Sequence, residues 1–540
     1  MSGGCGEIAH VPVGLTDTAS RRADPPDSPA RRWTDSPWLV PGLLGLAWLA
    51  VLILNLRTPV PSDQLNYMLA ADRFPHRVEA TTEMHQVTRF GLIVPVRLAI
   101  MVFGYSQAAY ATVPILATLT LLLGTYALGT LLFARPAGVA AALIVVAATP
   151  VAIDSTDLLP DVFAAGLFVC ALALAVWLRR RPDAPGPGAL LAVGALLGWS
   201  YLAREFVVFM WPVVVAVLFR RTRWTGLLWV AAPVALIGLA ELALCWRLYG
   251  DPFARAQAIL GHGQRPSTPS VAASYRDKSR MTYVLRLPHT LRAYPEGRVL
   301  KILIGLTLLG GLLRMRRILV LVAACASLWL PLTLLGGVLD PSAPKLRLQL
   351  IRYWFPVFPA FVLGGVGLVW IAAAALAGRI PRRGRARVAA AAALPAAAVL
   401  AVAAVSVGPA THSWWAGPAT RAGGGTQLES LRSWMRDNDQ GPDTRVWTDK
   451  HTRRVLKVYQ DGAFGGQAWP GRIRTVPPDG ERPRPGDLLV VFDAETGRVC
   501  ALCRVSAQTM LRNPVWAGPG WRQVYGTDDR VVRVYRLAPG

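Results

Sequence analysis

The chain has 540 residues, of which 53% are hydrophobic and 16% charged, with a mean hydropathy of +0.38. Its apolar residues fall into blocks of about 20, long enough to cross a bilayer, so the composition excludes a soluble globular protein. The formal net charge is +25, but the arginines stand in short runs between apolar blocks and form no soluble basic motif, so we expect no nucleic-acid partner.

The first 36 residues are polar and rich in proline, serine and arginine. A segment this poor in apolar residues has too little to bury for a folded core. Arginine flanking a first span favours the cytoplasmic side of a membrane. We therefore expect residues 1–36 to be a disordered cytoplasmic tail.

Apolar segments and arginine-rich loops together predict eleven membrane crossings and an all-α polytopic transmembrane domain over 37–410. The loops "FARP", "RRRPDAPGPG", "RRTR", "RMRR" and "GRIPRRGRAR" then all face the cytoplasm. Adding or removing one span would put half of them outside. The predicted spans are 38–56, 107–133, 137–153, 161–178, 189–203, 206–219, 225–246, 299–313, 318–337, 353–377 and 388–410.

The first outer loop, residues 57–106, contains "PSDQLNYMLAADRF" at 61–74. We predict a helix over 62–74, in which Asp63, Asn66 and Tyr67 share one face beside a more apolar side. That geometry suits an interfacial helix that holds a carboxylate toward a cavity. The alternative is that Asp63, which follows a proline and a serine, only caps the helix.

A second segment of this loop, "MHQVTRFGLIVPVRLAIMVFG", is also predicted to be a helix on the membrane surface. Arg89, Pro95 and Arg97 interrupt it, and its apolar part is short for a span. The alternative is a poor transmembrane helix.

Ionisable residues gather where the predicted spans reach the outer side. Such residues cost about 2.5 to 3.5 kcal/mol at the centre of a membrane helix, so they usually face a cavity or a partner. The acidic turn "DSTDLLPD" ends in Asp161, which is either a site residue or a helix cap. The other members of this group are Arg204, Glu205, Arg352 and Tyr353.

The outer loop 247–298 is unusually basic for its side of the membrane. One explanation is an anionic ligand, because guanidinium binds phosphate through two hydrogen bonds. The other is attraction to anionic lipid headgroups.

The remaining residues, 411–540, read as a small exocytoplasmic α/β domain. "TQLESLRSWMRDN" has helical spacing, "TRVWTD" and "GDLLVVFD" resemble strands, and "WRQVYGTDDRVVRVYRL" resembles a hairpin. Cys500 and Cys503 form either a local disulfide or two ordinary thiols, because no thioredoxin-like strand, turn and helix surrounds them; a redox pair is the alternative.

Taken in order, these motifs resemble the GT-C type polytopic membrane glycosyltransferases. The resemblance rests on an acidic residue after the first span and on "RFGLIVPVRLAIMVFGYSQAAY", "TPVAIDSTDLLPD", "LGWSYLAREFVVFMWP" and "LIRYWFPVFP". It covers about residues 38–375 and is closest to the family of protein O-mannosyltransferases and the lipid A aminoarabinose transferase, glycosyltransferase family 39. The tail resembles, more weakly, the exocytoplasmic domain of bacterial members.

The resemblance implies an enzyme of the cytoplasmic membrane that moves a hexose or pentose from a polyprenyl phosphate to an acceptor hydroxyl on the outer face. Asp63 would be the general base, with Asp161 as the second catalytic carboxylate, positioning substrate. Glycan, lipid or protein acceptors and membrane lipids are the expected partners. The residues expected to bind substrate are Tyr67, Glu83, His85, Arg89, Arg204, Glu205, Arg352 and Tyr353.

Two departures from the family pattern bear on the chemistry. The acidic pair after the first span is here Asp63 with Gln64, and only Glu83 stands near the position of a second acid. We therefore expect no cofactor and no metal site, although a divalent cation stays open. A carrier or flippase for lipid-linked sugars and an inactive cell-wall-binding relative are the alternative functions; the lack of internal repeats disfavours a transporter.

Overall fold

The structure is a computed structural model of the chain. Residues 1–35, Glu83, Cys500 and Cys503 lie outside the residues it describes, so the predictions made for them stay predictions. The described residues are 36, 38–56, 63–77, 84–262, 275–346, 348, 350–379, 385–416, 425–438, 443–449, 452–453, 456, 472–475, 482–492 and 507–539.

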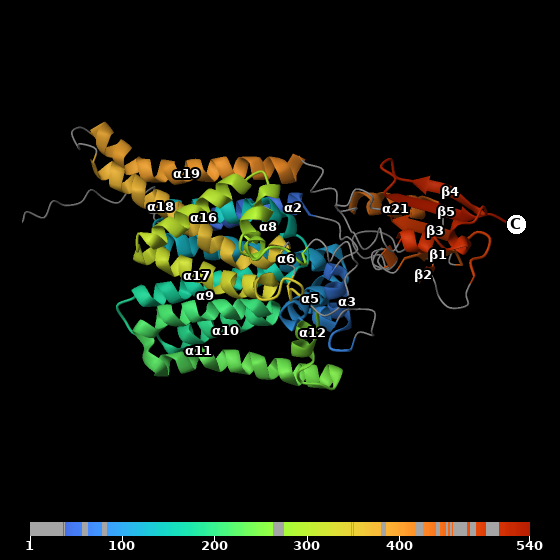
Figure 1. Ribbon diagram of the computed structural model, residues 1–540, viewed down its shortest axis with the longest axis horizontal. Coiled ribbons are helices and arrows are strands. Elements are labelled where there is room, and N and C mark those ends of the chain that lie inside the picture. Colours follow the sequence, from blue (N-terminus) through green and yellow to red (C-terminus); the bar gives the residue numbers. More distant parts are fainter. Residues whose placement is uncertain are drawn as a thin grey trace, which may run out of the picture. The chain divides into compact units, whose positions relative to one another are not determined.

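The chain is mainly helical up to residue 416 (Figure 1). The helices of its first half are α2 (Leu39–Leu54), α3 (Asp63–Arg73), α4 (Met84–Val87), α5 (Phe90–Phe103), α6 (Gln107–Leu132), α7 (Arg135–Ala147), α8 (Thr149–Asp154), α9 (Pro160–Arg180), α10 (Pro187–Ala203), the 3₁₀ helix η1 (Glu205–Met210) and α11 (Trp211–Tyr249). Those that follow are α12 (Ala254–His262), α14 (Arg280–Val284), α15 (Arg286–Thr290), η2 (Leu291–Ala293), α16 (Gly297–Leu312), α17 (Arg316–Thr333), η3 (Leu334–Val338), η4 (Ile351–Val357), α18 (Phe358–Arg379) and α19 (Arg385–Ala416).

Six helical segments among the described residues are long and apolar enough to cross a membrane: Gln107–Leu132, Pro160–Arg180, Glu205–Tyr249, Arg316–Val338, Ile351–Arg379 and Ala393–Trp415. Four shorter apolar helices are α2, α5, α7 and α10. The prediction of a polytopic helical membrane protein is confirmed, while the count of eleven crossings stays a prediction.

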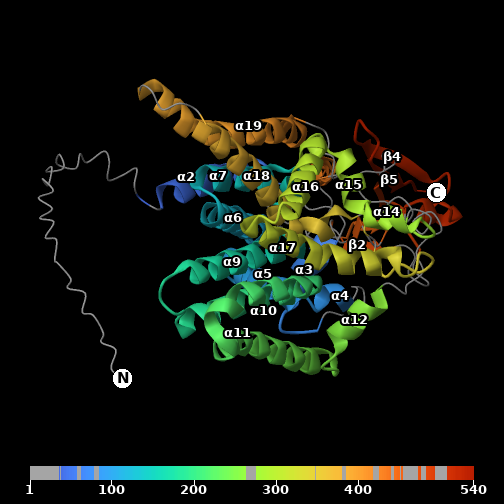
Figure 2. The same cartoon turned by 60° about the vertical axis from the view of Figure 1, so that its left-hand side comes forward.

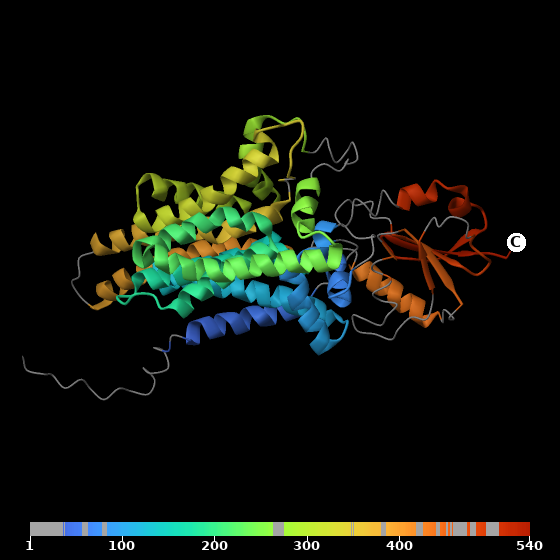
Figure 3. The same ribbon diagram turned by 90° about the horizontal axis from the view of Figure 1, so that it is seen from below.

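The longest of these segments contains a break that the sequence predicted. Arg223 has φ 55° and ψ −174°, which no helix contains, so α11 is two helices joined at this residue. The break falls between the predicted spans 206–219 and 225–246. Figure 3 shows the second of these helices as a long rod beside its neighbours.

Small residues let the helices of the bundle approach closely. A Cβ on Gly124 of α6 would lie 2.7 Å from Val169 Cγ1 and 2.8 Å from Cys170 Sγ, both on α9. Lipid tails are as apolar as the helices, so no hydrophobic force drives the helices together. Small residues at such crossings allow the close packing that holds them instead. Figure 2 shows α6 and α9 close together among the other long helices.

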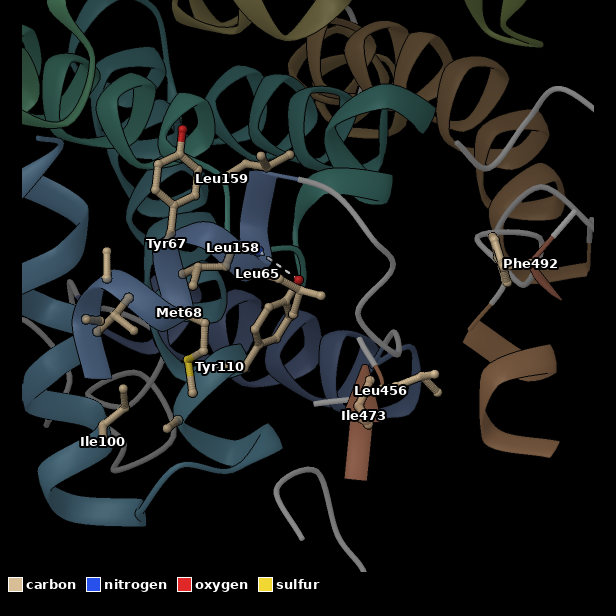
Figure 4. Packing of buried hydrophobic residues seen from close by; sticks show 14 of the residues in the cluster. Leu65, Tyr67, Met68, Ile100, Tyr110, Leu158, Leu159, Leu456, Ile473 and Phe492 are labelled. Carbon is tan, nitrogen blue, oxygen red and sulfur yellow. Dashed lines mark hydrogen bonds between the residues drawn. The ribbon is translucent and has the colours of Figure 1, made fainter. Parts of the chain in front are cut away.

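Helix α3 is buried on more than one side. Leu65, Met68 and Tyr67 are each at most 3% exposed, and Figure 4 shows Tyr67 and Met68 pointing to opposite sides of the helix. On α6, the hydroxyl of Tyr110 accepts a hydrogen bond of 3.4 Å from the backbone N–H of Leu158. Leu65 and Met68 of α3 belong to the same buried cluster as Tyr110 and Leu158, and this packing holds α3, and therefore Asp63, in place.

The C-terminal part contains a five-stranded sheet of order β2-β1-β3-β5-β4. Strand β1 pairs in parallel with β2 and β3, whereas β5 pairs antiparallel with β3 and β4. The predicted helix, strands and closing hairpin are confirmed, while the boundary at 410 stays a prediction. The elements are α21 (Gly425–Asp437), β1 (Arg445–Thr448), β2 (Arg472–Thr475), β3 (Leu488–Phe492), α24 (Pro514–Ala517), β4 (Trp521–Gly526) and β5 (Val532–Leu537).

Candidate active site

Asp63, the first residue of α3, meets two side chains from distant segments. Arg352 of η4 places Nη2 3.0 Å from Asp63 Oδ2. Gln86 of α4 donates a hydrogen bond of 2.8 Å to Asp63 Oδ1, and Asn66 of α3 donates to Gln86 Oε1. The carboxylate of Asp63 is therefore held by side chains, which goes beyond the capping role that the sequence left open.

Arg352 also reaches a second carboxylate. Its Nε lies 3.9 Å from Asp161 Oδ2, and Arg204 Nε lies 2.9 Å from Asp161 Oδ1. Asp161 stands in the first turn of α9, but the N-cap residue of that helix is Leu159. The side chain of Asp161 thus links two arginines, and it is only 1% exposed.

Aromatic rings hold Arg204 in position. Its guanidinium carbon lies 4.6 Å from the ring centre of Phe206 and 4.7 Å from that of Tyr353. The two rings meet edge to face, 5.7 Å apart. A cation over aromatic rings is attracted by their quadrupoles, and more strongly where water is excluded. The ring of Tyr353 therefore helps to orient Arg204.

A second group of charges surrounds Glu205 of η1. Its Oε1 lies 3.7 Å from Arg89 Nη2, and its Oε2 lies 3.7 Å from Arg255 Nη2. Arg89 also donates a hydrogen bond of 2.6 Å to the hydroxyl of Tyr67. Nη1 of Arg255, in α12, lies 3.0 Å from Oε1 of Glu241, in α11. Glu205 is thus held between two arginines that have other partners.

A close helix contact brings this second group together. A Cβ on Gly91 would lie 2.4 Å from the backbone nitrogen of Ala203, so α5 touches the last turn of α10 through bare backbone. Trp199 Nε1 donates a hydrogen bond of 3.0 Å to the Gly91 carbonyl across the same contact. Because Arg89 precedes α5 and Glu205 follows α10, this contact makes them neighbours.

We call these charged groups the ion-pair network. It balances four guanidinium groups against four carboxylates. Only three of the eight side chains are more than a tenth exposed: Asp63 at 31%, Arg352 at 22% and Glu205 at 21%. A ligand therefore meets these three first, with the others behind them. The members are Arg89, Arg204, Arg255, Arg352, Asp63, Asp161, Glu205 and Glu241.

Burial and charge act on Asp63 in opposite directions. Burial raises the pKa of its carboxyl, but the charge and hydrogen bond of Arg352, with smaller contributions from Arg89 and His85, outweigh burial and lower the pKa below its ordinary value of 3.8. Burial also raises the pKa of the Tyr67 phenol to about 12. At neutral pH, Asp63 is ionised and Tyr67 is not.

Most of the residues singled out in the sequence come together here, but not all of them face a ligand. Tyr67 is fully buried, and Tyr353 is 7% exposed. His85 lies near enough for its charge to act on the pKa of Asp63. Glu83 lies outside the described residues. The substrate contacts predicted for these residues stay predictions.

Three members of the site were not singled out by the sequence. Gln86 stands three residues before Arg89, in the short helix α4 that precedes α5. Arg255 was one of many basic residues in the loop 247–298. Glu241, in the apolar α11, carried a stronger signal, because a carboxylate in a span needs a partner.

Within the part of the chain that the structure describes, no three His, Cys, Asp or Glu side chains are grouped so that they could hold a metal ion. The arginines interleaved with the carboxylates give the site a different character. Its exposed members offer a guanidinium group, Arg352, to an anion and a carboxylate, Asp63, to a proton donor.

A helical bundle with several long apolar helices is the architecture of a polytopic membrane protein, and solved structures show the same fold. The chain superposes on ArnT from Cupriavidus metallidurans in the apo state with a TM-score of 0.55 and 14% sequence identity, over 95% of this chain and 100% of that one. For the same protein bound to undecaprenyl phosphate, the TM-score is 0.51 and the identity 15%, over 93% and 99% of the two chains.

These similarities show that the chain has a GT-C type glycosyltransferase fold, as the sequence motifs predicted. A structure of the Archaeoglobus fulgidus oligosaccharyltransferase tethered with an acceptor peptide also matches, with a TM-score of 0.49 and 13% identity over 94% of this chain and 75% of that one. No protein-family profile matches the sequence. No curated protein matches it by sequence comparison either.

Proposed function

We propose that the protein is a glycosyltransferase that moves a sugar from a polyprenyl phosphate to an acceptor hydroxyl. The observation that carries this proposal is the pairing of Asp63 with Arg352 at the exposed end of the ion-pair network. One group suits an acceptor that loses a proton, and the other suits a phosphate that leaves. The solved structure of ArnT with undecaprenyl phosphate supports a lipid-linked donor.

The chemistry assigned to these groups is a single displacement. Asp63 accepts the proton of the acceptor hydroxyl as its oxygen attacks the anomeric carbon. The bond from that carbon to the phosphate oxygen breaks, and the polyprenyl phosphate leaves with the electron pair. Arg352 stabilises the negative charge that develops on it. Attack opposite the leaving group inverts the anomeric carbon.

Binding of the donor prepares the base. Because the network already balances its charges, an arriving phosphate must displace a carboxylate from one of the arginines, and Asp63 is the most exposed one. Once Arg352 turns to the phosphate, the burial that raises the pKa of Asp63 is less opposed. Asp63 then becomes a stronger base at the moment when the donor is in place.

The remaining members of the network act behind these two. Asp161 positions Arg352 and Arg204 rather than accepting the proton, because it is almost fully buried between them. Glu205 is partly exposed, and its Oε2 accepts no hydrogen bond from the residues that the structure describes. We assign it the sugar hydroxyls of the donor or acceptor.

The reaction takes place, in this proposal, on the outer face of the cytoplasmic membrane. The N-terminal tail is then cytoplasmic, residues 37–410 form the catalytic transmembrane domain and residues 411–540 lie outside. The arginine-dense loops support this orientation through the positive-inside rule. The acceptor is a glycan, lipid or protein of the cell envelope.

Asp63→Asn tests the proposal, with Asp72→Asn on the same helix as the matched control. Purified protein is supplied with a polyprenyl-phosphate sugar and membrane extract as the source of acceptor. We expect Asp63→Asn to lower kcat by about 10²- to 10⁴-fold, since general base catalysis supplies about that much. Binding of undecaprenyl phosphate should be retained, and Asp72→Asn should behave as the wild type.

Unchanged turnover in Asp63→Asn would reject Asp63 as the base. A wild-type protein that moves the intact donor between leaflets of a vesicle and transfers no sugar would be a carrier instead. Sugar transfer and movement of the donor between leaflets are measured separately, so an enzyme and a carrier are distinguished.

A further inference from the structure

An open groove with a volume of about 740 Å³ lies between α9, α11 and α17. Each of these helices contributes one arginine to its lining: Arg179, Arg220 and Arg316. A smaller cavity of about 210 Å³ shares Arg179 and Arg316 and adds Arg180 and Arg317. We call the two hollows together the arginine groove.

The arginine groove is separate from the candidate active site. Helix α9 carries Asp161 in its first turn and Arg179 in its last. They are 18 positions apart, a rise of about 27 Å at 1.5 Å per residue. The groove therefore lies at the opposite end of the bundle, and nothing in the reaction proposed above uses it.

The charge in the groove has one sign. Neither cavity has a carboxylate in its lining, and the structure gives none of the five arginines an ion-pair partner among the residues it describes. All five side chains are exposed. The positive-inside rule accounts for arginine at this end of the helices, but it does not require three helices to direct arginines into one hollow.

The floor of the groove is apolar. Val213, Ala216 and Val217 of α11 face Val320 and Ala323 of α17. A soluble anion such as inorganic phosphate gains nothing from such a floor. A phospholipid uses both parts, because its phosphate meets the guanidinium groups while its acyl chain covers the apolar surface. The combination identifies the chemical class of the occupant.

We propose that the arginine groove binds an anionic glycerophospholipid from the membrane leaflet at that end of the bundle. Arg179 and Arg316 contact the phosphate, since both line the two hollows. The acyl chain lies between α11 and α17. The bound lipid neutralises arginines that would otherwise repel one another where three helices end.

Native mass spectrometry with added cardiolipin, compared with phosphatidylcholine, tests this proposal. The groove variant is Arg179→Gln with Arg316→Gln. The matched control is Arg135→Gln with Arg379→Gln, two exposed arginines at helix ends predicted to face the same side. We expect the groove variant to retain at least fivefold less cardiolipin than the wild type, and the control to match the wild type.

A third variant keeps the charges and fills the hollow. Ala216→Trp places a bulky ring on the apolar floor and should also lower cardiolipin binding severalfold, with all five arginines present. Melting temperatures in detergent identify a variant that has failed to fold. If the groove variant fails to fold, cardiolipin binding by Ala216→Trp decides the test. Equal loss in the groove variant and the control, or equal binding of phosphatidylcholine, overturns the proposal. The readout is lipid binding, so it is independent of sugar transfer.

Discussion

Arg352 acts on Asp63 in a way that pH can reveal. Arg352 lowers the pKa of Asp63 against burial, which raises it. In the free enzyme, the acidic limb of kcat/KM that belongs to Asp63 should therefore lie below pH 3.8. Because the folded pKa is below the unfolded one, the pair also stabilises the fold above that pH, and this stabilisation is lost as the pH falls through the folded pKa.

Arg352→Gln should move this acidic limb to higher pH. The substitution removes the charge that lowers the pKa of Asp63 and leaves the burial that raises it. In the proposed reaction the rate at the plateau should also fall, because the leaving phosphate loses its cation. Arg97→Gln, which removes a hydrogen bond to the Asp72 carbonyl, is the control. A limb at the same pH in wild type and Arg352→Gln would contradict the assignment.

Asp161 should matter for stability as much as for turnover. It is 1% exposed and pairs with Arg204, which is 5% exposed. Removal of one partner from a buried ion pair costs about 3 kcal/mol or more, because the other charge is left uncompensated. Asp161→Asn should therefore lower the melting temperature in detergent by several degrees. Asp183→Asn, at an exposed loop position, should leave it unchanged; equal melting of both variants would refute the buried pair.

The contact of α5 with α10 should tolerate no side chain at position 91. Gly91→Ala puts a methyl group 2.4 Å from a backbone nitrogen, so the helices must separate and Arg89 must move from Glu205. A displacement of about 1 Å at a site can cost about 10²-fold in rate. We expect at least a tenfold loss of kcat/KM.

Gly188→Ala is the control for this substitution. It lies in α10, and a Cβ there meets nothing within 4 Å. It should leave activity unchanged and slightly favour the helix. Wild-type activity in Gly91→Ala would mean that the contact does not position the site.

The helices were predictable because their cause is local. The apolar blocks and their arginine-rich ends predicted α6, α9 and the break at Arg223 within a few residues. Helix α19 extends six residues beyond the predicted end at 410, through "THSWWA". Within this extension, Trp414 packs edge to face on Trp48. Tertiary packing therefore lengthened the helix beyond its apolar block.

The partners within the site were less predictable. Asp63 and Arg352 each stood out as polar residues at span ends, but their pairing joins segments far apart in the chain. Gln86 and Arg255 gave no such signal, because a glutamine in a short helix and an arginine in a basic loop are common. The parallel pairing of β1 with β2 and β3 was also out of reach, since its partners are distant in sequence.

For the whole molecule, the orientation in the membrane can be measured with single cysteines in a chain freed of its six native ones. Ala184→Cys lies in an arginine-dense loop and Ser342→Cys in a predicted outer loop, and both positions are exposed. In intact cells, a membrane-impermeant maleimide should label position 342 and spare position 184. The reverse pattern would mean that the proposed topology is inverted. Labelling of both positions would mean that the number of spans between them differs from the predicted one.

The separation of Asp63 and Arg352 along the chain has a consequence for biosynthesis. The two residues are 289 positions apart, which a ribosome covers in about 15 to 60 s at 5 to 20 residues per second. During that interval the nascent protein carries Asp63 and Asp161 in the membrane before their shared cation has been made. A product truncated before η4 would therefore be an incomplete intermediate in which Asp63 lacks its guanidinium partner, recognisable to the proteases that clear unfinished membrane proteins.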